Sequence, residues 1–342
     1  MATTRKTRIV CISDTHNQTP KLPSGDVLIH AGDMTTQGSY AELRKTVEWL
    51  EKTEFQAKIV IAGNHDITLD HHSSTKRKPN GNGLRLKIPQ VFGSPYSPGQ
   101  RGWGFQYWGE QEAERVWAHS EMDDADIVVT HTPAYGYCDI AMEGERAGCV
   151  ALTRRLEVVR PMLYVCGHIH DARGFERVRW GPGASVIEPW TDPGEGNKKI
   201  SLIDLTEKSG HAIENAGRGV ARYSLPKVSA EALEGQSDQN KSNSTLNLAD
   251  DNSAIGQVKP EMYRKKAGGA IEYRHRRTPG GGGHDSVDAV QAGERNETAV
   301  INAALLSART VGKASTFDKP IVIDVELPIW RFDGDVDEVR WE

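Results

Sequence analysis

Residues 58–66 read Lys-Ile-Val-Ile-Ala-Gly-Asn-His-Asp, and this stretch decides the fold. Its first five residues form a short apolar run rich in β-branched side chains, which predicts a buried strand. The loop that follows, Gly63 to Asp66, brings the amide oxygen of Asn64, the imidazole of His65 and a carboxylate together. The stretch therefore predicts a strand that carries chemically active side chains at its carboxyl end.

Four other segments repeat this arrangement, in which an apolar strand leads into a polar residue able to bind a metal. A single Asp-x-His pair is a weak signal, because an Asx-type turn with an exposed histidine also explains it. Five strand ends whose polar residues are all Asp, Asn or His rarely arise by chance. The strands are expected over residues 7–14, 26–31, 126–130 and 162–166, and their polar residues are Asp14, His16, Asp33, His131, His168 and His170. Since alternate residues of an extended chain point to the same side, the last two histidines are expected to face one metal centre together.

A helix is expected between the strands at 26–31 and 58–62. Ser39 begins it, and Glu42 three residues later completes a capping box. Leu43, Val47 and Leu50 recur at helical spacing and give the helix one apolar face as far as about residue 53. A strand, a helix and a strand in succession form a right-handed crossover, so the two strands are expected to be parallel.

The rest of the first half predicts two more helices, over 110–122 and 147–159, and short strands over 84–88 and 103–107. The short strands enclose a loop at 92–99 that is rich in proline and glycine. Such a loop either shapes a substrate pocket or is a rigid surface loop. The adjacent pair His71-His72 is interpreted as part of a surface loop, because neighbouring residues do not share one face of a regular element.

The composition excludes several classes of protein. The 342 residues carry a net charge of −5, so the whole chain is no electrostatic nucleic-acid binder. No window approaches the ~20 apolar residues of a membrane span. The polar, basic residues 1–6 lack the apolar region of a secretory signal. We therefore expect a cytoplasmic protein whose cysteines, including Cys11 and Cys166 in predicted strands, are reduced and buried.

The chain loses this organisation from about residue 181 to 297. Apart from a candidate strand at 200–205, the segment has few aromatic or β-branched residues and is rich in Ser, Asn, Gln and Gly. It is therefore expected to be a long insertion, largely irregular or disordered. Its basic clusters at 264–266 and 274–277 are read first as solvated loops, and alternatively as a contact with an unknown partner. Apolar runs at 298–303 and 320–325 predict that the chain then returns to finish a sheet.

The polar residues at the five strand ends have the composition of a dinuclear metal site. Two divalent ions about 3.5–4 Å apart need a bridging anion and a shell of oxygen and nitrogen ligands. Mixed ligation without thiolate suits Mn, Fe, Zn or Co, with Mn favoured. Such a pair polarises a phosphoryl oxygen and generates a bridging hydroxide as nucleophile. The ligands are then Asp14, His16, Asp33, Asn64, His131, His168 and His170.

His65 is not among these seven candidate ligands. It lies next to a candidate ligand, so it can protonate a leaving alkoxide as a general acid. Asp66 either orients His65 or a ligand, or has a structural role in the turn.

The order of these motifs resembles the calcineurin-like metallophosphoesterase superfamily. Asp-x-His, Gly-Asp, Gly-Asn-His-Asp, a lone His after a strand, and Gly-His-x-His follow one another along the chain. Within that superfamily the chain is most similar to the metallophosphoesterase-domain-containing (MPPED) family. This closer resemblance is carried by residues 11–17, 59–65, 146–149, 300–303 and 320–324. It covers about 7–180 and 298–327 and says nothing about the segment between.

The resemblance implies a fold and a role for each site residue. The fold would be an α/β, four-layer sandwich of two mixed β-sheets flanked by helices, formed by 1–180 and 298–342 as a single domain. The site would lie at the strand ends, as is general in open α/β sheets. Some animal members have glycine where this chain has His168, so both metals are expected to be occupied here. One metal would be held by Asp14, His16, Asp33 and His170, the other by Asp33, Asn64, His131 and His168, and His65 would be the catalytic acid.

Three functions are compatible with these features. The first is hydrolysis of a small phosphodiester, with a cyclic nucleotide as one candidate, or of a phosphomonoester. The second is a non-catalytic metal-binding scaffold that uses the basic insertion as its contact surface, and the complete ligand set argues against it. The third is a nuclease, which would need a positive groove around the metals. The only basic cluster within 1–180 is at 76–78, so a nucleic-acid partner is not expected.

Overall fold

The computed structural model describes residues 4–70, 89–99, 102–118, 120–142, 144–181, 184–189, 200–213, 263–265, 271–274, 295–306 and 316–328. The predicted strand at 84–88, the pair at 71–72 and the basic cluster at 76–78 lie outside these residues. No helix within these ranges has the length and apolar character to cross a membrane.

The first sheet contains the strand of the Gly-Asn-His-Asp stretch at one edge. Its order is β11-β15-β1-β2-β3; β2 and β3 are parallel, as the crossover predicts, and β1 is parallel to β2 as well. β15 runs antiparallel to β1 along almost its whole length, so the sheet is mixed. The strands are β1 (Thr4–Ile12), β2 (Val27–Ala31), β3 (Ala57–Ile61), β11 (Ser201–Leu205) and β15 (Ile321–Pro328).

The second sheet is also mixed and has the order β12-β13-β10-β9-β14-β8-β7-β4. β4, β7, β8 and β14 are parallel to one another, and β9 and β10 are antiparallel additions. Two further short strands, β5 (Ser97–Pro98) and β6 (Gln106–Tyr107), pair separately. The strands of the second sheet are β4 (Val91–Ser94), β7 (Ile127–Thr130), β8 (Leu163–Cys166), β9 (Gly174–Arg179), β10 (Ala184–Pro189), β12 (Tyr263–Lys265), β13 (Ile271–Arg274) and β14 (Glu297–Asn302).

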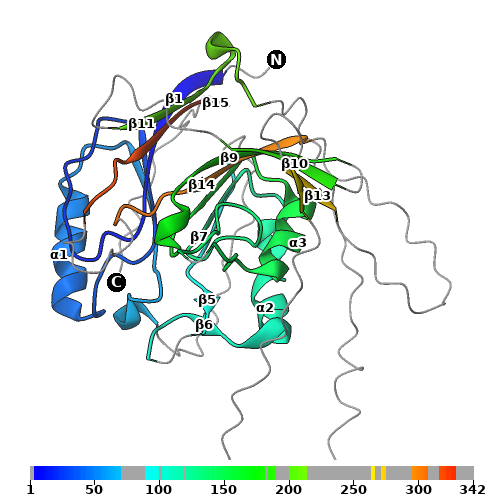
Figure 1. Cartoon of the computed structure of the whole chain (residues 1–342). Helices are drawn as coiled ribbons and strands as arrows, with labels where there is room; N and C mark the ends of the chain where they lie inside the picture. Colours follow the sequence, from blue (N-terminus) through cyan, green and yellow to red (C-terminus); the bar gives the residue numbers. More distant parts are fainter. Residues whose placement is uncertain are drawn as a thin grey trace, which may run out of the picture.

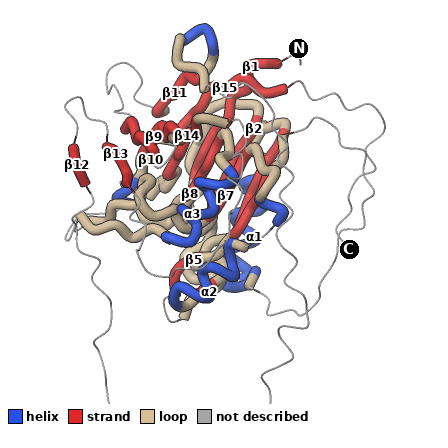
Figure 2. Tube along the Cα trace, turned by 90° about the vertical axis from the view of Figure 1, so that its right-hand side faces the viewer, coloured by secondary structure: helices blue, strands red, loops and turns tan. Residues whose placement is uncertain are grey.

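In the described part of the chain, three α-helices cover the outer faces of the two sheets. Figure 1 shows α1 (Tyr40–Glu51) beside the first sheet, and α2 (Gly109–Trp117) and α3 (Val150–Val159) beside the second. The view from the side in Figure 2 shows most of the strands running alongside one another above the helices. The capping box expected at the start of α1 is confirmed, because Ser39 and Glu42 bond to each other's backbone N–H groups. Single 3₁₀ turns occur at Ile67–Leu69, Ser120–Met122, His170–Ala172 and Glu207–Ser209.

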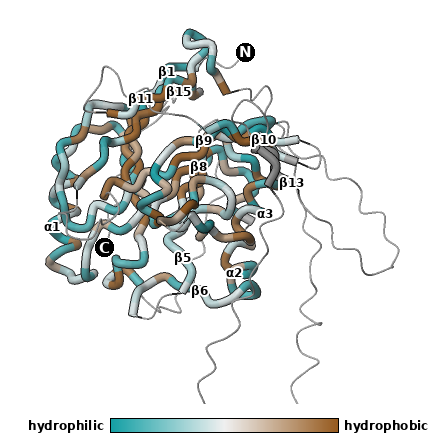
Figure 3. The backbone as a smooth tube through the Cα atoms, in the orientation of Figure 1, coloured by the Kyte–Doolittle hydropathy of each residue, from teal (hydrophilic) through white to brown (hydrophobic). Residues whose placement is uncertain are grey.

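Three apolar clusters hold four layers together. One, with Ile29 and Val165, lies between the two sheets; another, with Leu152 and Trp117, joins the second sheet to α2 and α3. The third includes Leu50 and joins the first sheet to α1. Figure 3 shows the most hydrophobic tube along the strands in the interior. The chain is thus an α/β four-layer sandwich of two mixed sheets flanked by helices, the architecture that the resemblance implies.

Several details differ from the sequence prediction. Val47 of α1 is 41% exposed, and the neighbouring Thr46 is buried instead and bonds to the Met34 carbonyl. The helix expected to reach residue 122 ends at Trp117, and the strand expected over 103–107 is only the short β6. The returning chain adds β14 to the second sheet and β15 to the first, and so completes both sheets.

The strand expected at 200–205 is confirmed as β11, which pairs with β15. β10 also lies within the range 181–297 and pairs with β9. Both sheets therefore take strands from the stretch assigned to the insertion, and the limits of that insertion remain a prediction. The four cysteines are free and buried, as expected.

Candidate metal centre

The loops after β1, β2, β3, β7 and β8 meet at one edge of the two sheets. The first two are joined side by side, because Asp14 N–H donates to the Gly32 carbonyl (2.9 Å) and His16 N–H to the Asp33 carbonyl (3.1 Å). In the second sheet, Gly167 N–H donates to the His131 carbonyl (3.0 Å). All seven candidate ligands lie on these loops, at the carboxyl ends of parallel strands, where open α/β sheets bind ligands.

The backbone of these loops is strained at the candidate ligands. Asp14, His16, Asp33 and His168 have φ of 55°, 42°, 54° and 68°. They are half of the eight non-glycine residues with positive φ in the described part of the chain. Backbone strain persists where the surrounding structure over-determines it, and it is concentrated at functional sites. The strain therefore marks this edge as a site.

Two motif glycines let the loops approach one another. A Cβ at Gly63 would collide with the backbone nitrogen and Oδ1 of Asp33, and one at Gly167 would collide with Ser13 and Asp14. Glycine is the residue that allows such close approach of backbone to a neighbouring group. Gly63 and Gly167 therefore permit the packing that brings the ligand loops together.

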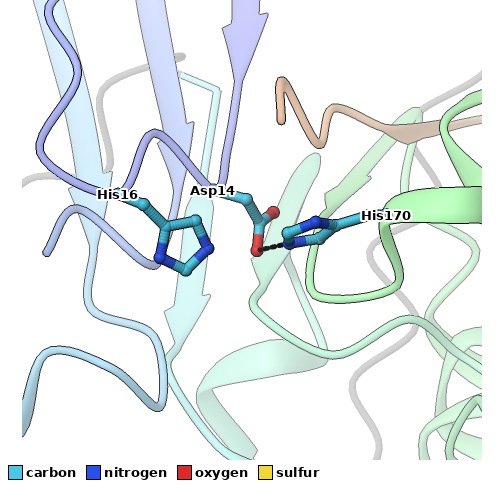
Figure 4. Close-up of side chains that lie close together, drawn as sticks. All are labelled: Asp14, His16 and His170. Carbon is cyan, nitrogen blue, oxygen red and sulfur yellow. Dashed lines mark ion pairs between the residues drawn. The ribbon is translucent and has the colours of Figure 1, made fainter. Parts of the chain in front are cut away.

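The first group of candidate ligands is Asp14, His16 and His170, whose ligating atoms all lie within 4.8 Å of one another. Figure 4 shows the imidazoles of His16 and His170 flanking the carboxylate of Asp14. The Nε2 of His170 is 3.3 Å from the Oδ1 of Asp14. One carboxylate and two imidazoles around a common point can hold a divalent cation.

The second group is Asp33, His131 and His168, with ligating atoms again within 4.8 Å of one another. The Nε2 of His131 lies 3.3 Å from the Oδ1 of Asp33 and 2.9 Å from the Oδ1 of Asn64. Asn64 therefore adds an amide oxygen to this group. The structure thus brings all seven residues together in two adjoining groups.

Asp33 lies between the two groups. Its Oδ1 faces His131, whereas its Oδ2 is 3.8 Å from the Nε2 of His16. The backbone N–H of His65 donates to its Oδ1 (2.8 Å), which fixes the carboxylate. A carboxylate with one oxygen toward each group has the geometry of a bridging ligand.

His65 is also in the cluster, and its Nε2 lies 3.9 Å from the Oδ2 of Asp33. His16, Asp33 and His65 make a third group whose ligating atoms lie within 4.8 Å of one another. By distance alone His65 is a candidate ligand as well as a candidate acid. Measuring metal content in a His65 variant separates these two roles.

Backbone carbonyls orient three of the imidazoles. The Nδ1 atoms of His16, His65 and His131 lie 3.1, 2.7 and 2.9 Å from the carbonyls of Thr35, Thr36 and Ala31. A carbonyl only accepts, so each Nδ1 carries the proton and each Nε2 is directed to the cluster. Metal-binding histidines in proteins have this outer contact, which sets the tautomer.

The electrostatics of the cluster favour a cation. Burial opposes the charge on Asp14 and Asp33, but the surrounding histidines hold the pKa of both carboxyls below the ordinary value. Burial and the nearby His131 lower the pKa of His168 to about 4, so its imidazole is neutral. Burial lowers the pKa of His131, yet Asp33 outweighs it and raises the value to about 9. Two ionised, desolvated carboxylates among imidazoles fit a pair of divalent ions.

Two sequence expectations about this site need correction or completion. The extended backbone expected over 168–170 is wrong, because His168 is in the left-handed region and His170 begins a 3₁₀ turn. The two histidines consequently enter different groups. Asp66 accepts from the N–H groups of Gly63, Met34 and Thr35 at 2.8, 3.2 and 2.9 Å, and so ties two ligand loops together.

Sequence reasoning missed two residues that support the site. Asn302 of β14 is fully buried and donates to the carbonyls of Ile169 (2.9 Å) and Cys138 (3.1 Å), and so holds the loop of His168 and His170. Trp103 packs on His65 with ring centroids 3.7 Å apart. Both come from distant segments, and the only signal was a polar Asn in an otherwise apolar strand run.

Comparisons with known proteins agree with this geometry. A family model described as "Calcineurin-like phosphoesterase" matches residues 7–172. "Metallophosphoesterase domain-containing protein 1" of Homo sapiens is 37% identical over 202 residues, covering 49% of this chain and 62% of that protein. A UPF0046 protein of Caenorhabditis elegans is 31% identical over 200 residues, covering 49% of this chain and 70% of that protein.

A third relative is much longer than the matched region. "Probable rhamnogalacturonate lyase C" of Emericella nidulans is 39% identical over 196 residues, covering 51% of this chain but only 18% of that protein. The chain thus spans less than two thirds of the human and the Emericella relatives. The match of the family model, residues 7–172, includes all seven candidate ligands.

Proposed function

We propose that this chain, which belongs to the calcineurin-like phosphoesterase family, hydrolyses phosphoric esters with two divalent metal ions. The observation that carries the proposal is the meeting of seven oxygen and nitrogen donors in two groups that adjoin at Asp33. A structural site would need one ion and a closed shell, whereas a shared carboxylate between two donor groups suits a dinuclear centre.

The roles of the residues follow from their positions. Asp14, His16, Asp33 and His170 would hold one ion, and Asp33, Asn64, His131 and His168 the other. When bound, the two ions would polarise the phosphoryl oxygen and activate a water molecule as the nucleophile. The backbone N–H of His168, which donates to Asp14, and that of His65, which donates to Asp33, keep both carboxylates in place.

His65 would act as the general acid. Its Nδ1–H is held by the Thr36 carbonyl at 2.7 Å, so its Nε2 is the nitrogen presented to the site. The side chain is 23% exposed, more than the Asp33 carboxylate at 3%, so it lies where the leaving group can meet solvent. A proton on Nε2 would pass to the leaving oxygen as the phosphorus–oxygen bond breaks.

The substrate class we propose is a small phosphoester, with a phosphodiester first and a cyclic nucleotide as one candidate. Carboxylate, amide and imidazole donors without thiolate suit Mn, Fe, Zn or Co, and manganese is the metal that we favour. The cytoplasmic location expected from the sequence stays a prediction, as does a partner for the segment 181–297.

Hydrolysis of bis-p-nitrophenyl phosphate by the full chain tests the proposal. The protein is expected to turn over the substrate when manganese is added and to lose turnover with a chelator. His65→Ala is expected to be slower by about 10²–10⁴-fold on an ester with a basic leaving group, and less on bis-p-nitrophenyl phosphate, whose p-nitrophenolate leaves with little help from an acid. Absence of turnover above the metal-free background with each of the four metals would refute the phosphoesterase and favour the non-catalytic scaffold.

A further inference from the structure

The indole of Trp103 covers one face of the His65 imidazole. The ring centroids are 3.7 Å apart and the ring planes are inclined by 34°. Trp103 belongs to none of the three candidate ligand groups. It lies on the segment 102–107, which follows His65 in the sequence by about 40 residues. Its contact with the proposed acid therefore has to be held by other interactions of that segment.

Two hydrogen bonds fasten this segment to the loop that carries the acid. Gly104 N–H donates to the Asn64 carbonyl at 2.9 Å, and Phe105 N–H donates to the Oδ2 of Asp70 at 2.9 Å. On its other side, the Phe105 carbonyl accepts from Ser97 N–H at 3.0 Å. The residues on either side of His65 thus hold the segment that carries Trp103.

The segment makes these bonds with a strained backbone at Phe105. Phe105 has φ of 52°, a value that a bulky residue rarely adopts. Such strain persists only where neighbouring contacts impose it. The strain at Phe105 is explained if this backbone conformation is needed to place the Trp103 ring over His65.

Among the contacts of the His65 ring, Trp103 supplies the one to its face. Its Nδ1 bonds to the Thr36 carbonyl, and the His16 ring meets it edge-on with centroids 4.7 Å apart. The hydrogen bond alone leaves the imidazole free to tilt about the Nδ1 contact. The indole prevents this tilt and keeps water from the face of the ring that it covers.

We propose that Trp103 is a positioning residue for His65, which keeps the Nε2 of the acid directed at the leaving group. The inference rests on the proposed function, because it assigns Trp103 a part in the same reaction. Misplacing a catalytic group by about 1 Å can cost about 10²-fold in rate, so the loss on removing the indole should be large. The loss of rate should affect the step in which the leaving oxygen is protonated.

The test is a leaving-group series measured on the full chain with manganese. The substrates are methyl aryl phosphates whose leaving phenol ranges from p-nitrophenol to unsubstituted phenol. The more basic phenolate depends more on the acid. Trp103→Leu is expected to lower kcat about tenfold or more for phenol and less than about threefold for p-nitrophenol, with KM little changed. Trp103→Phe retains an aromatic face and is expected to recover most of the loss.

Trp108→Leu is the matched control, because it makes the same exchange five residues away at an indole that is 56% exposed. Trp108→Leu should leave kcat unchanged for every substrate of the series. An equal loss for all phenols, or no loss, in a chain whose wild type is active would overturn the inference while the proposed function stands. Wild-type inactivity on the whole series would refute both.

A second readout does not depend on activity. In the zinc-loaded full chain labelled with ¹⁵N-histidine, the ring protons of His65 should carry a ring-current shift from the indole. Zinc is suitable because its filled d shell leaves the spectra sharp. The shift should vanish in Trp103→Leu and persist in reduced form in Trp103→Phe. An unchanged His65 ring resonance in Trp103→Leu would overturn the stacking contact itself.

Discussion

The backbone N–H of His168 donates to both carboxylate oxygens of Asp14, at 3.2 and 3.0 Å. The two residues are 154 positions apart and follow strands of different sheets. Asp14 is therefore both a candidate ligand and the anchor that ties the loop after β8 to the loop after β1. A substitution at Asp14 can separate these two roles.

Asp14→Asn is expected to lose metal while the fold is kept. The amide oxygen can still accept from His168 N–H, but the negative charge that attracts a cation is gone. Activity should fall by more than ~100-fold, beyond the range seen when only an outer contact of a ligand is removed. The measurement is the metal content per chain by mass spectrometry, together with the thermal midpoint. Ser13→Ala, at the adjacent buried residue, should retain its metal; full metal occupancy in Asp14→Asn would contradict the assignment.

His65→Ala is expected to lose activity without losing metal. The acid contributes about 10²–10⁴-fold to the rate, whereas the ions would be held by the other seven side chains. The comparison is His16→Ala, whose Nε2 lies at nearly the same distance from Asp33. If His65→Ala binds one ion fewer than the wild type, His65 is a ligand and some other group must protonate the leaving oxygen.

Asp66→Asn is expected to destabilise the fold and weaken metal binding together. Its two oxygens accept from three backbone N–H groups and from the Thr35 hydroxyl at 2.7 Å. An amide has one oxygen, so its NH₂ group would face N–H donors in a buried place. The free energy of unfolding should fall by about 2–4 kcal/mol, and metal affinity by about 10–100-fold.

Thr35→Val is the graded control for Asp66, because it removes the hydroxyl, which contacts Asp66 and the His65 carbonyl, and leaves the three backbone N–H bonds to Asp66 in place. Its effect on unfolding should be smaller than that of Asp66→Asn. Urea unfolding of the metal-free chains gives the stability, and titration with zinc gives the affinity. Equal stability of Asp66→Asn and the wild type would mean that the four contacts do not hold the two loops.

The candidate ligands could be predicted because each signal is local. An apolar strand that ends in Asp, Asn or His is visible in a few residues, and parallel strands bring such ends to one edge. The capping box of α1 is likewise contained in the four residues from Ser39 to Glu42. Local chemistry and a crossover rule were therefore sufficient for the capping box and for the parallel pairing of β2 with β3.

The remainder could not be predicted because it depends on contacts between distant segments. The left-handed backbone at His168 is imposed by the hydrogen bond to Asp14 and by the close packing at Gly167, which a run such as Gly-His-x-His does not reveal. The stacking of Trp103 on His65 arises from bonds made by Gly104 and Phe105. The pairing of β10 with β9 depends on a stretch that composition assigns to an insertion.

Glu176 makes stability depend on pH at a place away from the metal ligands. Burial raises the pKa of this carboxyl from 4.5 to about 7, although the Cys138 N–H donates to its Oε2 at 3.0 Å and Arg146 acts in the same opposing direction. The folded chain then holds this proton more tightly than the unfolded chain. Its contribution to stability is present below about pH 4.5 and is lost as the pH rises through about 7.

Glu176→Gln, which cannot ionise, should remove this loss. The difference in unfolding free energy between the variant and the wild type is expected to rise from pH 5 to pH 8 by on the order of 2 kcal/mol in favour of the variant. Urea unfolding of the metal-free chains at pH 5, 6, 7 and 8 measures it, since taking the difference cancels groups common to both. Glu51→Gln, at an exposed residue at the end of α1, is the matched control. A flat difference for Glu176→Gln would show that this carboxyl ionises in the folded chain as it does in the unfolded one.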